Sequence, residues 1–151
     1  APLLLWGYAK QAEPRNLPTH WAEVNSIIVQ KEGGKCGESN ILFLPWHLYM
    51  NFRFIGNIVA TPAPYYFECK VISGTNMEFG GIYDNSAESK SRAVEVWLNG
   101  KGDSDLLVNQ NIKYIVLAKE VDCQNYNWLN KNSKLRVLLD SQNLILYEVL
   151  K

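Results

Sequence analysis

Apolar side chains recur along this chain with two different spacings, which predict its helices and its strands. In the stretch THWAEVNSIIVQK, the residues Trp21, Val24 and Ile28 follow one another at intervals of three and four, so they share one face of a helix. Pro18 suits the first position of this helix, and Gly33 suits its end. We therefore expect a helix between these two residues.

Short continuous apolar runs predict strands, and such runs are typical of strands buried on both faces of a sheet. ILFL at 41–44 is one of them, and Pro45 ends it. IKYIVLAKE at 112–120 is the clearest strand of the chain. The expected strands are 41–44, 57–60, 65–72, 112–120, 135–140 and 144–150, of which the last two form a hairpin around the polar turn SQN.

Helices are expected between several of these strands. A helix over 87–99 has Val94 and Trp97 on its inner face, and shorter helical segments are expected over 103–108 and 122–130. Strand–helix–strand units favour parallel strands joined by right-handed crossovers. The predicted fold class is therefore α/β: a small mixed sheet of about four to six strands with a parallel centre and an antiparallel C-terminal hairpin, flanked by helices.

The size and charge of the chain fit one domain and argue against nucleic-acid binding. The chain has 151 residues, 47% of them hydrophobic, which is enough for one core. Fifteen basic residues balance fifteen acidic ones, so no net field attracts nucleic acid. The start, APLLLWGYAKQ, is shorter than the about 20 apolar residues of a membrane span. We expect residues 1–15 to be a juxtamembrane or packing segment and 16–151 to be a single α/β domain.

The three cysteines allow at most one internal disulfide. Cys36 lies in the glycine-rich stretch EGGKCGES and is the most exposed candidate, but the sequence does not decide its partner between Cys69 and Cys123. No two cysteines have the spacing of a zinc site, and the two histidines lie far apart in the sequence. We expect neither a metal nor a cofactor.

His47 is the residue of greatest chemical interest, because it follows the carboxyl end of the expected strand 41–44, where open α/β sheets place their sites. The glycine- and asparagine-rich loop 73–86 is expected to lie close to this end. One hypothesis is acid–base chemistry by His47 with Glu78 or Asp84, and the competing one is a half-buried structural imidazole. The expected ligand-binding rim comprises Trp46, His47, Tyr49, Asn76, Glu78 and Asp84.

The order of several segments resembles a known family. The segments are NLPTHWAEVN, ILFLPWHLYM, NIVATPAPYYF, VISGTNMEFGGIY, NIKYIVLAKEVD and LILYEVL. Together they resemble the soluble C-terminal domain of archaeal multi-pass membrane proteins that are similar to C-type glycosyltransferases and related polysaccharide-assembly membrane proteins. The resemblance covers nearly the whole chain but includes no diagnostic motif.

The resemblance implies a non-catalytic domain on the extracytoplasmic side of a membrane, attached at its N-terminal side. In that family the chemistry is expected in the membrane portion, so no catalytic residue is carried over to this chain. The implied partners are the membrane portion of the same chain and a saccharide or lipid-linked saccharide. Two alternatives remain: a structural or protein-interaction module unrelated to sugars, and a small enzyme that uses His47.

Overall fold

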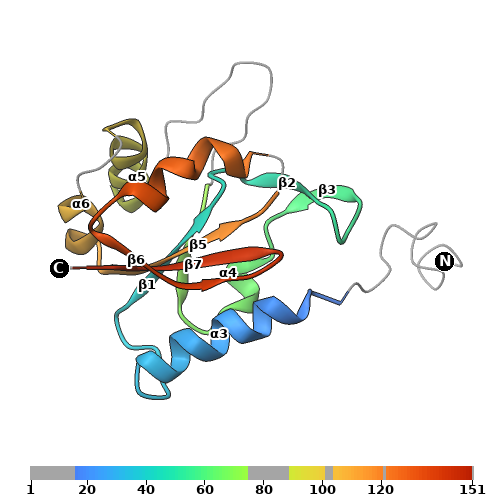
Figure 1. Ribbon diagram of the computed structural model, residues 1–151, viewed down its shortest axis with the longest axis horizontal. Helices are drawn as coiled ribbons and strands as arrows, with labels where there is room; N and C mark the ends of the chain where they lie inside the picture. The colour runs from blue at the N-terminus through green and yellow to red at the C-terminus, as the bar shows by residue number, and fades with distance from the viewer. Residues whose placement is uncertain (1–15, 75–88, 101–103, 121, 151) are drawn as a thin grey trace, which may run out of the picture.

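A computed structural model describes residues 16–74, 89–100, 104–120 and 122–150 of the chain (Figure 1). The helices are α3 (Thr19–Lys31), α4 (Ala63–Tyr66), α5 (Ser89–Gly100), α6 (Asp105–Asn109) and the 3₁₀ helix η1 (Cys123–Lys131). The strands are β1 (Asn40–Leu44), β2 (Tyr49–Phe52), β3 (Asn57–Ala60), β4 (Lys70–Ile72), β5 (Ile112–Ala118), β6 (Leu135–Asp140) and β7 (Leu144–Val149).

Five strands form one mixed sheet in the order β4-β1-β5-β7-β6. β1 pairs in parallel with β4 and β5, whereas β7 pairs antiparallel with both β5 and β6. The predicted fold class is therefore confirmed, including the parallel centre and the antiparallel C-terminal hairpin. β2 and β3 form a separate antiparallel hairpin outside this sheet.

Each face of the sheet is covered by different helices, with α3 along one side and α5, α6 and η1 along the other (Figure 1). Alternate residues of β1 show the two faces: Ile41 and Phe43 join the core under α3, while Leu42 and Leu44 join the core under α5 and η1. All four side chains are fully buried. This explains why the sequence of β1 is continuously apolar instead of alternating.

The core under α3 is centred on the ring of Trp21. This ring stacks on Phe67 with centroids 5.5 Å apart and meets the edge of Tyr66 at the same distance. Ring pairs of this kind add to the free energy gained by burying the apolar surface. The helical face predicted from the sequence is thus the buried face, since Val24 and Ile28 are also fully buried.

Two segments differ from the sequence-based expectation. The prediction of a strand over 65–72 is wrong for its first half, because Tyr65 and Tyr66 end helix α4 and only Lys70–Ile72 is a strand. Aromatic residues favour strands on average, but here Pro62 and Pro64 precede them, and Pro62 starts a helical turn. The ambiguous stretch after Pro45 contains β2.

A disulfide bond joins the segments that precede the parallel strands β1 and β4. Cys36, in the loop before β1, forms a disulfide with Cys69, the residue before β4, and Cys123 is a free thiol. The disulfide therefore holds the starts of these neighbouring parallel strands together.

Over the part of the chain that the structure describes, no helix combines the length and the apolar character needed to cross a membrane.

Candidate functional site

The connections that leave β1 and β5 pass to opposite faces of the sheet. After β1 the chain enters β2, whose Met50 and Phe52 belong to the core under α3. After β5 it enters η1, whose Leu129 belongs to the opposite core. Neighbouring parallel strands whose connections diverge in this way leave a crevice at their carboxyl ends, where open α/β sheets bind ligands.

A cavity of about 280 Å³ lies at this crevice. That volume is near the lower end of the range of about 300–1,000 Å³ for small-molecule pockets. The residues that line it come from the ends of β1 and β5 and from the β2–β3 hairpin: Pro45, His47, Tyr49, Met50, Asn51, Ile58, Glu120 and Asp122. The cavity therefore has a polar wall from the sheet and a largely apolar wall from the hairpin.

His47 and Asp122 form the outer part of the polar wall. His47 Nε2 lies 3.0 Å from Asp122 Oδ2, which joins the ends of β1 and β5 directly. The backbone around His47 is fixed from two sides. The amide of Trp46 donates to the hydroxyl of Tyr126 at 2.8 Å, and a Cβ atom at Gly74 would lie only 2.8 Å from the His47 amide nitrogen.

Glu120 forms the inner part of the polar wall and is 5% exposed. Its Oε2 accepts a hydrogen bond from the backbone amide of Arg53 at 3.2 Å, and the Arg53 Nε lies 3.7 Å away on a side chain that is 76% exposed. Burial raises the pKa of the Glu120 carboxyl, and the contacts with Arg53 offset this only in part. The negative charge of the Glu120 carboxylate at the cavity is therefore only partly balanced by Arg53.

The hairpin supplies the opposite wall. Tyr49 is 51% exposed and Ile58 is 71% exposed, while Met50 and Phe52, which alternate with Tyr49 and Asn51 along β2, are buried. Asn51 pairs with Ile58 across the hairpin and lies on the same exposed face. An exposed aromatic ring beside amide and carboxyl groups is a surface that suits a ligand with both apolar and hydroxyl-bearing faces.

The structure brings together only part of the rim expected from the sequence. His47 and Tyr49 line the cavity, whereas Trp46 packs against the core on the other face, with its Nε1 3.5 Å from Glu95 Oε1. Asn76, Glu78 and Asp84 lie outside the described residues. The start of the loop that contains them does lie where it was predicted, because Gly74 contacts the backbone of residues 46 and 47.

Sequence reasoning missed Glu120 and Asp122. The available signal was their place just after the clearest strand, because the carboxyl ends of parallel strands lie at one edge of a sheet. Within the described ranges, no three His, Cys, Asp or Glu side chains cluster in a way that could hold a metal ion.

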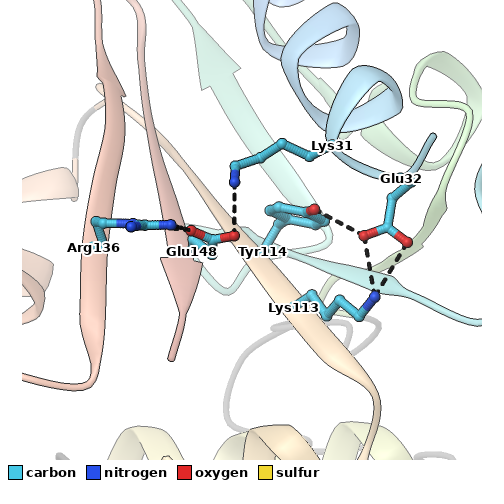
Figure 2. A network of polar contacts seen from close by, with 6 residues as sticks. All are labelled: Lys31, Glu32, Lys113, Tyr114, Arg136 and Glu148. Atoms are coloured by element: carbon cyan, nitrogen blue, oxygen red, sulfur yellow. Dashed lines mark hydrogen bonds and ion pairs between the residues drawn. The ribbon is translucent and has the colours of Figure 1, made fainter. Parts of the chain in front are cut away.

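A second polar cluster lies at the other end of β5 and has a different character (Figure 2). Glu32 accepts hydrogen bonds from Tyr114 Oη at 2.8 Å and from Lys113 Nζ at 3.2 Å. Glu148 is paired with Lys31 Nζ at 3.0 Å and with Arg136 Nε at 3.0 Å. Burial opposes ionisation of both carboxyl groups, but hydrogen bonds from Ser39, Tyr114 and Lys113 lower the pKa of Glu32. Hydrogen bonds from Arg136 and Lys31 likewise lower the pKa of Glu148.

No protein-family model, no curated protein and no solved structure matches this chain.

Proposed function

We propose that this domain is a non-catalytic extracytoplasmic module of a multi-pass membrane protein, and that it supports glycosyl transfer or polysaccharide assembly by binding a saccharide. The proposed ligand site is the cavity between the carboxyl ends of β1 and β5. The observation that carries the proposal is the pairing of an exposed Tyr49 ring on one wall with the polar groups of His47, Glu120 and Asp122 on the other. Sugar rings are recognised by stacking on an aromatic face combined with hydrogen bonds to their hydroxyl groups.

Two further features support the proposal. The Cys36–Cys69 disulfide fits an oxidising compartment such as the extracytoplasmic side of a membrane, because disulfides persist there. The resemblance of the sequence to domains of polysaccharide-assembly membrane proteins points to the same side and to a saccharide as ligand.

The test is a titration of isotope-labelled protein with neutral oligosaccharides, followed by the shifts of backbone amide signals. We expect shifts in residues 47–58 and 118–122, with a dissociation constant of roughly 1 mM, or about −4 kcal/mol, because a shallow isolated site buries little of its ligand. Tyr49→Ala is expected to weaken binding about fivefold, since it removes the stacking surface.

Tyr65→Ala is the matched control. Tyr65 is 93% exposed on α4, outside the cavity, so this variant is expected to bind like the unmodified protein. Amide shifts confined to residues at the amino end of β5 would contradict the proposed location of the saccharide site. No shift with any saccharide would favour a structural or protein-interaction module instead.

One observation favours a second candidate function, acid–base catalysis at the same cavity. The contact of His47 with Asp122 is the arrangement in which a carboxylate orients an imidazole that moves protons. Under our proposal, His47→Ala lowers stability and weakens saccharide binding, and it removes no turnover. A variant that keeps its unfolding midpoint and loses a measured turnover would establish the enzyme instead.

A further inference from the structure

The carboxylates of the cavity have fewer cations around them than those of the opposite cluster. At the amino end of the sheet, Glu32 and Glu148 are bonded to three basic side chains, Lys31, Lys113 and Arg136. At the cavity, within the residues that the structure describes, Asp122 contacts His47, and Glu120 is approached by one cation, the largely solvent-exposed Arg53. The charge of the site is therefore compensated less completely by the chain itself.

The lysine nearest in sequence does not supply the missing charge. Lys119 directly precedes Glu120, but its Nζ forms an ion pair with Asp140 at the end of β6. Its backbone amide donates to the carbonyl of Asn143 at 2.8 Å. Lys119 is thus bound to the β6–β7 hairpin, away from the two acidic residues.

Glu120 also retains an open acceptor. Its Oε2 receives the contacts from Arg53, whereas no hydrogen bond to Oε1 is present in the part of the chain that the structure describes. Among the described residues, Oε1 is not one of the buried side-chain atoms that lack a partner, so this oxygen is accessible to solvent. Since Glu120 lines the cavity, a ligand that brings a hydrogen-bond donor can bond to this open oxygen.

We infer that the saccharide bound in this cavity carries a protonated primary amine, and that Asp122 and Glu120 hold this amine. The inference rests on the proposed function and names the class of its ligand, an amino sugar that is not N-acylated. An ammonium group has three donors and no acceptor, so it can serve two carboxylates at once. The ring carbons of the same sugar then face Tyr49.

The N-acetylated form of the same sugar is the discriminating ligand. Its amide carries no charge and one donor, and its carbonyl oxygen is a further acceptor in a site already rich in acceptors. It leaves the two carboxylates without a cation, while the rest of the ring is unchanged. The difference between the two forms therefore isolates the contribution of the amine.

The experiment compares the disaccharide of glucosamine with its N,N′-diacetyl form, using the amide shifts of labelled protein at neutral pH and roughly 0.15 M salt to screen long-range attraction. We expect the amine form to bind about tenfold more tightly, the usual effect of one hydrogen bond to a charged group. Asp122→Asn is expected to abolish most of this preference. The Asp122 side chain is 44% exposed, so the variant should fold normally.

Glu68→Gln serves as the control, because it removes an exposed carboxylate that is bonded to Asn25 and does not line the cavity. It is expected to keep the full preference for the amine. Equal binding of the two disaccharides would overturn the inference and leave the saccharide site in place. A preference that survives Asp122→Asn would also overturn it, and binding of neither sugar would remove the proposed function as well.

Discussion

The two ends of strand β5 carry similar side chains in different surroundings. At its amino end, Glu32 and Glu148 are each bonded to basic residues, and the nearby Cys36–Cys69 disulfide ties the entries of β1 and β4 together. At its carboxyl end, Glu120 lines an open cavity and has an elevated pKa. The carboxylates paired with basic residues are expected to stabilise the fold. A carboxylate that lacks a full set of basic partners can instead bind a group of a ligand.

Removal of the disulfide should lower the free energy of unfolding more than any other change at the amino end of β5. The bond joins residues 33 positions apart in the sequence, and a crosslink of this size stabilises by about 4 kcal/mol because it restricts the unfolded chain. We expect Cys36→Ser together with Cys69→Ser to lower the free energy of unfolding by this amount in urea titrations. Cys123→Ser, which removes the free thiol, is the control, and an equal loss in that variant would contradict the prediction.

Neutral replacements of one glutamate at each end should have opposite signs. Glu32→Gln weakens the contacts with Lys113 and Tyr114, so we expect a loss of about 2 kcal/mol. Glu120→Gln removes a charge whose burial disfavours the folded state, so we expect no loss or a gain of up to about 1 kcal/mol at pH 7.

Unfolding midpoints in urea distinguish these two outcomes. A loss of similar size in both variants would mean that the two carboxylates have equivalent roles, and it would end the contrast between the two ends of β5.

The smallest effect is the dependence of stability on pH. The pKa values of Glu32 and Glu148 are lowered in the folded protein, so their contribution is present above their ordinary value of 4.5 and is lost as the pH falls through the folded values. The pKa of Glu120 is raised, so its contribution has the opposite sign and is fully present below 4.5.

We therefore expect acid to destabilise the protein as these two carboxyl groups become protonated. Glu32→Gln should flatten this acid dependence and Glu120→Gln should steepen it. Urea unfolding at a series of pH values between 3 and 7 measures both slopes, and identical slopes in the two variants would refute the assignment.

The fold was largely predictable from the sequence because its signals are local. The apolar run of β1 and the periodic face of α3 are each determined by neighbouring residues, and both were placed to within one residue. The segment before β4 was not, because its aromatic residues favour a strand while the flanking prolines favour a turn. Local preferences conflict there, and packing against Trp21 decides the outcome.

Only part of the candidate site could be predicted from the sequence, because its composition depends on which strands pair with one another. His47 was found from its place after β1, but Asp122 lies 75 residues further along the chain. Only the parallel pairing of β1 with β5 brings the two together. Trp46 was placed on the rim with its neighbour His47, yet the two side chains diverge because the chain turns between them at the end of the strand.

The position of β7 has a consequence for how the protein is made. This last strand lies between β5 and β6 and pairs with both of them. During synthesis on the ribosome, β5 can pair with β1 early, but its second edge stays without a partner until residues 144–149 have emerged. An unpaired interior edge invites association with other nascent chains. We therefore expect the nascent chain to be more prone to aggregation before this strand is inserted than after it.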